Sequence, residues 1–369
     1  MRILFLVSSM EGGGAERVAA LLCNRWVKQG YQVVLMPTFS GRGGCSYPLD
    51  PRVDLQFLVD RTQTRLARTQ LGRLLALRRA VREIAPDVVL SFLTNVNVAA
   101  ILAGGGTPVI VSERIYPPME PTAAVWNGLR RLTYPAAASV VMQTRQGLRW
   151  LESTIPSARG AIIPNPIVVP IPEVAPILDP SMFIAPDQKL LLNVARLVPQ
   201  KNLGLLIDAF AVIAAEEPAW RLVILGEGPE RQELEARVAA LTMSSHIYLV
   251  GQAGNLDSWY QRADAFAFTS RFEGFPNALL EAVAYGVPSL SLDCPTGPAE
   301  LIEHGVNGLL LPVNSSSSEV ASQLRHLLSS HWPQTDAKAA RMRETYRIET
   351  VANEWVKLFE RLLAERQDK

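Results

Sequence analysis

The chain contains 369 residues, of which 48% are hydrophobic and 19% are charged. This length is enough for two domains with separate cores, and the composition excludes a largely disordered, collagen-like or repeat protein. Cys23, Cys45 and Cys294 form neither a zinc-binding pattern nor a disulfide framework, which favours a reducing compartment. No apolar run approaches the roughly 18 residues that a membrane-spanning helix needs. The sequence therefore predicts a folded cytoplasmic protein of two domains.

The net charge of +1 conceals an uneven distribution of charge. Residues 1–185 carry 19 Lys and Arg against 12 Asp and Glu, whereas the remainder carries 17 against 23. A basic half favours an anionic partner, such as a membrane surface, a nucleic acid or a phosphorylated substrate. Chance unevenness on solvated faces is the alternative, and only a concentrated basic element decides between the two.

Strand and helix patterns alternate along the N-terminal half. A strand is predicted at 3–8, followed by a helix at 16–29 that Gly30 ends. A long helix is predicted from about residue 62 to residue 84. The further strands of this half are predicted at 32–37, 87–92, 108–112 and 139–143. This repetition predicts a parallel sheet with helices on both faces.

A proline-rich segment separates this half from the next. Residues 164–188 contain seven prolines in 25 residues, which no helix or central strand tolerates, so we predict a connection between two domains. After it, strands are predicted at 190–194, 221–225, 246–250, 265–269 and 289–292, with helices at 203–215 and 230–241. Two such halves predict a ligand cleft between them, at the carboxyl ends of their strands. We place the domains at 1–170 and 171–345, followed by a helical segment at 346–369 that could pack back on the first domain.

Two glycine-rich turns follow predicted strands. Gly12-Gly13-Gly14 precedes the first helix, where glycine lets a ligand approach the backbone and the helix N-terminus offers N–H groups to an anion. A tight turn without a ligand is the alternative. Gly226-Glu227-Gly228 is more similar to a dinucleotide-binding motif, but Arg231 stands where its third glycine belongs. We therefore expect no nicotinamide or flavin there.

Charged residues follow two strands of the second half. Arg196 and Lys201 lie on one short strand-to-helix loop, and two such cations suit a diphosphate, because each charge-assisted hydrogen bond contributes about 1.5–3 kcal/mol. A solvated pair of cations is the alternative. Glu273 precedes a helix predicted to start at Pro276, and Glu281 lies one to two turns along it. An axial separation of about 10 Å fits the reach from a sugar to the ribose of a nucleotide sugar.

These segments together resemble a known family. GGGAER, NVARLVPQKN, FTSRFEGFPNALLEAVAYGVP and CPTGPAELIEHGVNGLLLP are similar to the motifs of family-4 retaining glycosyltransferases, and the resemblance covers almost the whole chain. EGGGAERV, VVLSFLT and VSER resemble the branch that elongates polyprenyl-diphosphate-linked saccharides and exopolysaccharide precursors. The resemblance implies an α/β protein of GT-B fold, in which two Rossmann-like, doubly wound parallel-sheet domains face a cleft. The first domain would bind the acceptor and the second the nucleotide sugar.

The resemblance also implies the roles of individual residues. Arg196 and Lys201 would hold the donor diphosphate, Glu273 would bond hydroxyls of the donor sugar, and Glu281 would hold the ribose. The first three form the implied catalytic set. The implied donor site also includes Gly13, Gly14, Gly274, Phe275, Pro276 and Asn277. The implied reaction retains the anomeric configuration by front-face attack, with the leaving diphosphate taking the acceptor proton, and needs no metal or cofactor.

Two features of the sequence bear on the predicted acceptor site. Many members of the family carry a histidine after the strand corresponding to 108–112, whereas this chain has Glu113 and Arg114, which we expect to orient the donor or the acceptor.

Five arginines of the predicted long helix fall within about 100° of a helical wheel, without an acid between them. They are Arg61, Arg65, Arg68, Arg79 and Arg82. We expect the first three to contact anionic lipid headgroups or an acceptor diphosphate; a solvated helix face is the alternative.

The sequence therefore predicts a retaining glycosyltransferase that is cytoplasmic and peripheral on the inner face of the membrane. It would move a hexose or N-acetylhexosamine from a UDP-sugar to a polyprenyl-diphosphate-linked saccharide. The alternatives are the same fold and donor with a soluble sugar acceptor, and an epimerase that acts on the nucleotide sugar. A non-catalytic binding module would need a damaged donor site, and no nucleic-acid partner is expected, because no recognition motif accompanies the basic face.

Overall fold

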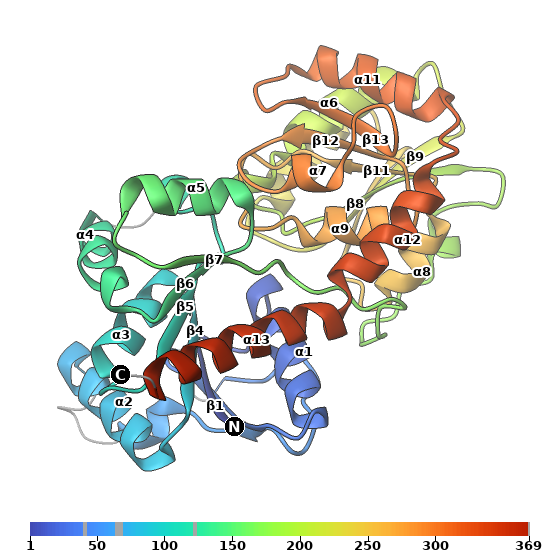
Figure 1. Ribbon diagram of the computed structural model, residues 1–369. Helices are drawn as coiled ribbons and strands as arrows, with labels where there is room; N and C mark the ends of the chain where they lie inside the picture. Colours follow the sequence, from blue (N-terminus) through green and yellow to red (C-terminus); the bar gives the residue numbers. More distant parts are fainter. Residues whose placement is uncertain (40–42, 63–68, 121–123, 368–369) are drawn as a thin grey trace. The chain divides into compact units, whose positions relative to one another are not determined.

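The computed structural model describes residues 1–39, 43–62, 69–120 and 124–367. The chain divides into two compact units, the first formed by Met1–Pro166 and Ile348–Lys369 and the second by Ile167–Arg347. Each unit is built on one parallel sheet, of 7 strands in the first and 6 in the second (Figure 1). The predicted α/β class with two Rossmann-like sheets is thereby confirmed.

The first sheet has the strand order β3-β2-β1-β4-β5-β6-β7. Its strands are β1 (Arg2–Val7), β2 (Gln32–Pro37), β3 (Asp54–Leu55), β4 (Val88–Phe92), β5 (Val109–Ser112), β6 (Ser139–Met142) and β7 (Gly160–Ile162). Phe5 of the central strand β1 lies opposite Leu35 of β2 and Leu90 of β4. The chain order reverses between β1 and β4, and sheets of this type bind ligands at the carboxyl edge near such a reversal.

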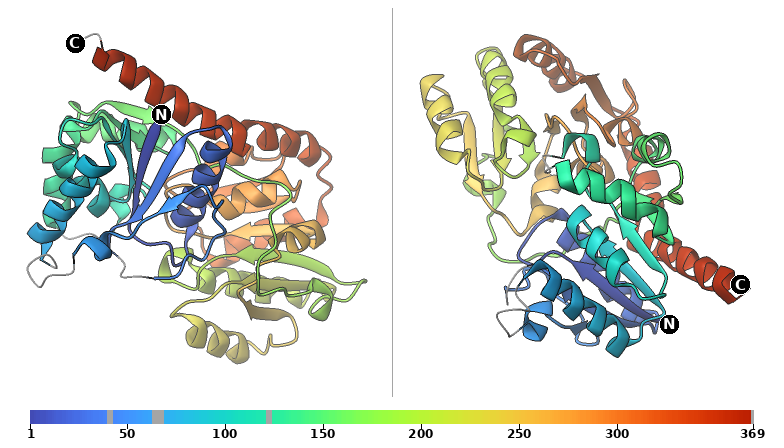
Figure 2. Two further views of the ribbon diagram at one scale, coloured as in Figure 1. Left: turned by 90° about the horizontal axis from the view of Figure 1, so that it is seen from below. Right: turned by 90° about the vertical axis from the view of Figure 1, so that its left-hand side faces the viewer.

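Helices cover both faces of this sheet. They are α1 (Gly14–Lys28), α2 (Gln70–Ile84), α3 (Thr94–Ala103), α4 (Ala124–Thr133), α5 (Arg145–Thr154) and α13 (Ile348–Gln367). Figure 2 shows α13 and α2 on opposite sides of the sheet. The final helix α13 packs on α1, where the ring centroids of Trp26 and Phe359 lie 5.5 Å apart. The end of the chain is therefore part of the first unit and completes its core.

The long helix predicted from about residue 62 begins later, at Gln70. Thr69 is its N-cap, and the Thr69 hydroxyl accepts a hydrogen bond from the Gly72 N–H at 3.1 Å. Arg61 instead ends a short 3-10 helix, η1 (Leu58–Arg61). Arg65 and Arg68 lie outside the described residues. The prediction that one helix carries all five arginines was therefore wrong, because a capping threonine separates Arg61 from α2.

The second sheet has the strand order β10-β9-β8-β11-β12-β13. Its strands are β8 (Lys189–Val194), β9 (Trp220–Leu225), β10 (Ile247–Gly251), β11 (Ala265–Phe268), β12 (Ser289–Asp293) and β13 (Gly308–Pro312). Its helices are α6 (Leu203–Ala214), α7 (Arg231–Ala240), α8 (Leu256–Arg262), α9 (Asn277–Ala284), α10 (Pro298–Leu301), α11 (Ser317–Ser329) and α12 (Thr335–Tyr346). The order reverses between β8 and β11, which pair directly, with Ala265 opposite Leu191.

The proline-rich segment belongs to the second unit. The chain enters this unit at Ile167, whose N–H donates to the Tyr346 carbonyl at 2.7 Å. Further along, the Asn255 side chain bonds both the N–H and the carbonyl of Leu178 at 2.9 Å. The prediction that the whole segment connects two domains was therefore wrong. Side-chain hydrogen bonds replace the backbone pairing that proline prevents, and they fix the segment to the surface of the unit.

Candidate functional site

The carboxyl ends of β8 and β11 bring the predicted donor-site residues of the second unit together. Arg196 and Lys201 follow β8, and Glu273 follows β11. Because β8 and β11 are neighbours at the reversal of strand order, their loops leave the same edge of the sheet side by side. Residues that are 72 positions apart in the chain are thus placed in contact.

Lys201 and Glu273 form an ion pair at this edge. The Lys201 Nζ lies 2.5 Å from the Glu273 Oε1, and the two side chains are only 15% and 10% exposed. The ammonium group also lies 5.7 Å from the centroid of the Phe268 ring. A pair that is largely withdrawn from water interacts more strongly than a surface pair. The site therefore contains a cation whose charge is neutralised by the neighbouring carboxylate.

The glycine turn at 226–228 supports the loop that carries Arg196. The Leu197 N–H donates to the Glu227 carbonyl at 2.9 Å. A side chain at Gly226 or Gly228 would place its Cβ 1.9 Å from the Ala195 carbonyl oxygen or 2.3 Å from that of Leu197. These glycines therefore permit a close approach of two backbones. Arg196 itself is exposed.

The loop of Glu273 is held by hydrogen bonds to the loop between β12 and α10, to which sequence analysis had assigned no role. The Glu273 N–H donates to the Pro295 carbonyl at 2.7 Å, and the Thr296 hydroxyl donates to the Glu273 and Gly274 carbonyls at 3.1 and 2.9 Å. Gly297 allows this contact, because a Cβ there would lie 2.4 Å from Cδ of Pro276. The loop between β12 and α10 therefore positions Gly274, Phe275 and Pro276. Only the glycine between threonine and proline signals this in the sequence.

Gln200 links the loop after β8 to the loop after β11 by hydrogen bonds to backbone groups. Its side chain donates to the Phe272 carbonyl at 2.7 Å, and its own carbonyl accepts from the Arg271 N–H at 2.8 Å. Thr269 also donates to the Lys201 carbonyl at 3.0 Å. These bonds fix the separation of the two loops, so the Lys201–Glu273 pair sits on a rigid base. Sequence reasoning had assigned no role to Gln200 or Thr269.

Glu281 lies deeper, on helix α9. This helix begins at Asn277 with Pro276 as its N-cap, one residue later than predicted. The Glu281 carboxylate is buried and accepts a hydrogen bond from the hydroxyl of Tyr260, on α8, at 2.9 Å. The ring of Tyr260 stacks on that of Tyr285, with centroids 5.4 Å apart. The carboxylate is therefore held in one orientation by a side chain that the sequence had not singled out.

In the first unit, the turn of Gly12, Gly13 and Gly14 leads directly into α1. Gly12 has φ of +128°, a conformation that favours glycine. The Gly13 N–H donates to the Tyr47 hydroxyl at 3.0 Å, and that hydroxyl donates back to the Gly13 carbonyl at 2.8 Å. The turn is thus tied to the loop that follows β2. It lies at the carboxyl end of β1, beside the reversal of strand order.

Glu113 and Arg114 are neighbours in sequence but have opposite surroundings. Glu113 is buried, and its carboxylate accepts hydrogen bonds from Arg130 Nε at 2.8 Å, from Thr94 Oγ1 at 3.1 Å and from the Tyr134 hydroxyl. A second carboxylate, Glu120, also bonds Arg130, at 2.8 Å. Burial, and after it the charge of Glu113, raises the pKa of Glu120. The oxygens of Glu113 are therefore occupied by protein donors.

Arg114 has its guanidinium stacked on an aromatic ring. Its Cζ lies 3.3 Å from the centroid of Phe92, and its Nη1 donates to Asn165 Oδ1 at 2.7 Å. Its Nε and Nη2 are buried and have no hydrogen-bond partner among the residues that the structure describes. Burial lowers the pKa of Arg114 well below its usual range. Glu113 and Arg114, which were predicted together, thus differ. The Glu113 oxygens already accept hydrogen bonds, whereas Arg114 still has N–H donors available.

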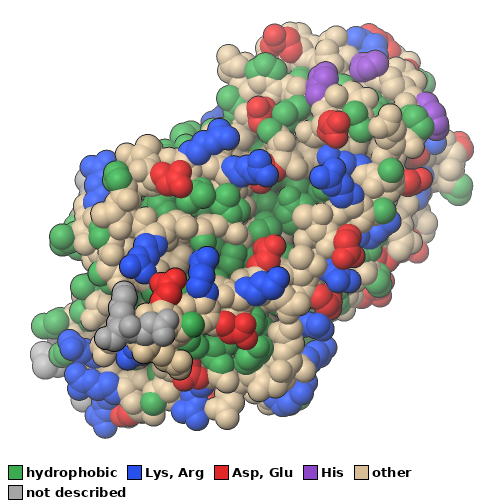
Figure 3. Space-filling view, viewed as in Figure 1, with side chains coloured by type: hydrophobic (Ala, Val, Ile, Leu, Met, Phe, Trp, Pro, Cys, Tyr) green, Lys and Arg blue, Asp and Glu red, His purple; other side chains and the backbone are tan. Residues whose placement is uncertain are grey.

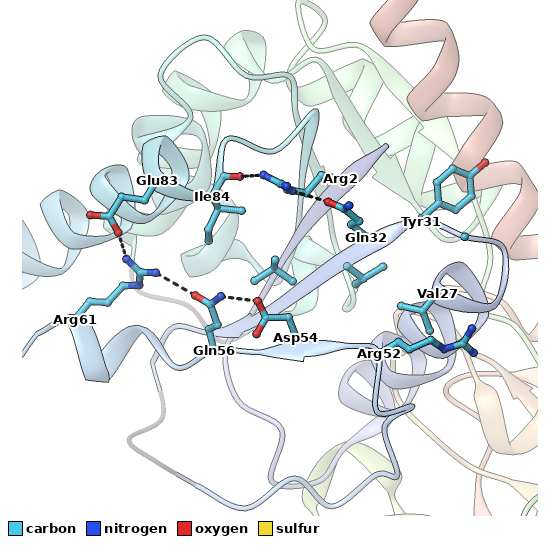
Figure 4. Close-up of a pocket in the computed structure, with 13 residues that line it drawn as sticks. Arg2, Val27, Tyr31, Gln32, Arg52, Asp54, Gln56, Arg61, Glu83 and Ile84 are labelled. Atoms are coloured by element: carbon cyan, nitrogen blue, oxygen red, sulfur yellow. Dashed lines mark hydrogen bonds and ion pairs between the residues drawn. The ribbon is translucent and has the colours of Figure 1, made fainter.

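Arg61 lies at the other edge of the first sheet. It lines a hollow of about 720 Å³ together with Arg2 and Gln32, which begin β1 and β2 (Figure 4). Arg61 pairs with Glu83 and with the Gln56 side chain, the latter at 3.0 Å. Glu83 also pairs with Arg79 at 2.6 Å. An acid therefore does lie among these arginines, and Arg61 is separated from the carboxyl-edge residues Gly13 and Arg114.

The chain matches two glycosyltransferase families, one in each half. Residues 12–169 match the family described as glycosyltransferase family 4, and residues 176–347 match glycosyl transferases group 1. The two matches together cover most of the chain. The chain is therefore a glycosyltransferase, its first half matches family 4, and its two sheets are those of a GT-B fold.

Relatives with known names extend this result. An exopolysaccharide phosphotransferase of Streptomyces coelicolor is 28% identical over 409 residues, which cover 100% of this chain but 41% of that protein. The chain thus spans less than half the length of that relative. The GalNAc-α-(1→4)-GalNAc-α-(1→3)-diNAcBac-PP-undecaprenol α-1,4-N-acetyl-D-galactosaminyltransferase of Campylobacter jejuni is 27% identical over 370 residues, covering 97% of this chain and 98% of that protein.

A solved structure supports the fold. The structure of Anabaena HepE in complex with UDP has a TM-score of 0.77 at 19% identity, over 98% of this chain and 100% of that chain. Within the described residues, no helix is both long enough and apolar enough to span a membrane.

The surroundings of Glu113 lead to a prediction about stability. Replacing Glu113 by Gln leaves the buried Arg130 with a single carboxylate, and breaking a buried ion pair costs about 3–5 kcal/mol. We expect the free energy of unfolding to fall by this amount in urea denaturation followed by circular dichroism. Glu83→Gln is the control, because its ion pairs are exposed, and it should change the stability little. Equal effects of the two substitutions would contradict the assignment.

Proposed function

We propose that this glycosyltransferase moves a hexose or N-acetylhexosamine from a UDP-sugar to a polyprenyl-diphosphate-linked saccharide, with retention of the anomeric configuration. The observation that carries the proposal is the Lys201–Glu273 pair, with Arg196 on the same loop, at the carboxyl ends of two adjacent strands. A diphosphate needs cations at such an edge, and a donor sugar needs a fixed carboxylate for its hydroxyls. The Lys201–Glu273 ion pair supplies one such cation and one such carboxylate.

In the proposed reaction, Arg196 and Lys201 stabilise the charge that develops on the leaving diphosphate. The bond from the anomeric carbon to the β-phosphate oxygen breaks, and the acceptor oxygen bonds that carbon on the same face. The acceptor proton passes to the leaving phosphate oxygen. Glu273 orients the donor sugar, with the backbone of 274–277 beside it, while Gly13 and Gly14 cover the diphosphate. The proposed reaction involves no metal ion and no cofactor.

The lipid-linked acceptor is supported by the Campylobacter jejuni relative, whose name includes undecaprenol linked through PP. A UDP donor is supported by the HepE structure, which contains UDP. Association with an anionic membrane surface is supported by helix α2, which exposes Leu71 and Leu75 as well as Arg78, Arg79 and Arg82. Figure 3 shows basic side chains gathered at the end of the first unit that carries α2. We place the protein on the inner face of the membrane, with Arg61 near the same region.

The direct test is the release of UDP from a panel of UDP-sugars, with and without a polyprenyl-diphosphate-linked saccharide. We expect one preferred donor, and stimulation of UDP release by the lipid-linked acceptor. A soluble sugar that stimulates release equally well would instead favour the soluble-acceptor alternative. Interconversion of the UDP-sugar without release of UDP would favour an epimerase. Absence of UDP binding would contradict the proposal.

Substitutions of Lys201 and of Glu273 are expected to have different effects. The first should weaken UDP binding, and the second should slow turnover. Lys201→Ala removes a charge-assisted bond to the diphosphate and should weaken UDP binding about tenfold or more. Glu273→Gln leaves the lysine charge uncompensated and should not weaken UDP binding, but it should lower kcat by about a hundredfold, since the sugar contact is lost. Calorimetry with UDP and initial rates with the preferred donor measure both. Equal losses in UDP affinity would contradict these separate roles.

Tyr260 is expected to act on the ribose through Glu281. Tyr260→Phe removes a hydrogen bond to a buried carboxylate and should weaken UDP binding about five- to tenfold. The preference for UDP over 2′,3′-dideoxy-UDP should fall with it, because the loss acts through the ribose hydroxyls. Tyr248→Phe is the matched control: it loses only a bond to the Ser245 carbonyl at the surface. An unchanged preference in Tyr260→Phe would contradict the positioning role.

A further inference from the structure

Two arginines of the first unit are withdrawn from water, but only one of them is compensated. Arg130 lies 2.8 Å from a carboxylate oxygen of each of Glu113 and Glu120. Arg114 takes part in no ion pair with any residue in the described ranges. Its Nη1 bonds Asn165, while its Nε and Nη2 are buried without a partner. Buried charges in proteins are as a rule paired, so this guanidinium needs an explanation.

Other unpaired polar atoms lie beside Arg114. Gln143 donates through Nε2 to the same Asn165 oxygen at 2.6 Å, but its Oε1 is buried and has no partner within the described part of the chain. The Trp355 ring centroid lies 5.9 Å from the Arg114 Cζ, and the Trp355 Nε1 is likewise buried and unpaired. One small region thus contains three unused N–H donor atoms and one unused acceptor. Unpaired groups of this kind are few in folded proteins.

The fold assembles this group at the carboxyl edge of the first sheet. Arg114 follows β5, Gln143 follows β6 and Asn165 follows β7, and these three strands are neighbours. Trp355 reaches the same place from α13, at the far end of the chain. Parallel α/β sheets bind their ligands at this edge. Arg114 as a whole remains partly exposed, although its Nε and Nη2 are buried.

The unused atoms define the chemistry of an occupant. Stacking on Phe92 fixes the plane of the Arg114 guanidinium, so that Nε and Nη2 form one fork. A fork of this kind matches the oxygens of an oxyanion, and Trp355 supplies a further donor. A phosphoryl group offers enough acceptor oxygens for all three N–H groups. The unused Gln143 Oε1 accepts a hydrogen bond, which suits a hydroxyl next to the phosphoryl group.

We propose that Arg114, Gln143 and Trp355 bind a phosphoryl group that carries a hydroxyl-bearing neighbour, the chemistry of a sugar attached to phosphate. This inference rests on the proposed function, in which the acceptor contains such a junction between sugar and diphosphate. The diphosphate of the donor is the other possible source. Glu113 is not part of this site, because its oxygens already accept from Arg130, Tyr134 and Thr94.

The binding test uses the whole protein and two ligands. Calorimetry measures the Kd of a geranyl-diphosphate-linked N-acetylhexosamine and of UDP for the wild type, for Arg114→Gln and for Arg149→Gln, an exposed arginine of the same unit. We expect Arg114→Gln to weaken binding of the lipid-linked sugar about ten- to a hundredfold and to leave the Kd of UDP within twofold. Loss of UDP binding instead would identify the donor as the source of the phosphoryl group. No change for either ligand would overturn the proposal.

Thermal unfolding distinguishes this site from a structural arginine and from the proposed donor site. Because Arg114→Gln removes an uncompensated buried charge, we expect its Tm to be at or above that of the wild type. Inorganic pyrophosphate should raise the Tm of Lys201→Ala but not that of the double variant Arg114→Gln/Lys201→Ala. This result does not depend on UDP binding, so a failure of the proposed function leaves it interpretable. A lowered Tm together with unchanged stabilisation by pyrophosphate would show a structural role only.

Discussion

The pairing of β8 with β11 is the constraint on which the rest of the candidate donor site depends. These strands are separated in the chain by two strands and three helices, yet their neighbouring positions place the loops of Lys201 and Glu273 in contact. Each loop is then supported from its outer side, one by the glycine turn at 226–228 and the other by Thr296 and Gly297. Hydrogen bonds to backbone groups therefore hold the two loops in place, and the loops position the charged side chains of the site.

Buried charge is treated differently in the two units. In the second unit Lys201 and Glu273 neutralise each other's charge within one ion pair. In the first unit two carboxylates surround Arg130, whereas Arg114 has none. The Arg130 cluster ties α3, α4 and the loop after β5 together, which is the task of a structural network. The Arg114 guanidinium forms no comparable network, and this difference is the basis of the phosphoryl site proposed above.

The two units match different glycosyltransferase families and contain different charged groups. The second unit matches glycosyl transferases group 1 and contains the Lys201–Glu273 pair and the buried Glu281. The first unit matches glycosyltransferase family 4 and contains the glycine turn and Arg114 at the carboxyl edge of its own sheet. Helix α13 belongs to this unit, and through Trp355 it contributes to the surroundings of Arg114.

The sequence by itself determined the class of fold and most of the central strands, whereas the roles of the candidate donor-site residues stay predictions. Buried parallel strands are apolar throughout, and glycine and proline mark their ends, so both signals are local. Predictions from the sequence were wrong where a contact between residues far apart in the chain determines the local structure. A capping threonine moved the start of α2, Asn255 bound the proline-rich segment to the second unit, and Glu83 paired with Arg61. The ion pair of Lys201, the donor to Glu281 and the lack of compensation at Arg114 were likewise decided only by tertiary structure, because hydrogen bonds and burial depend on which strands become neighbours.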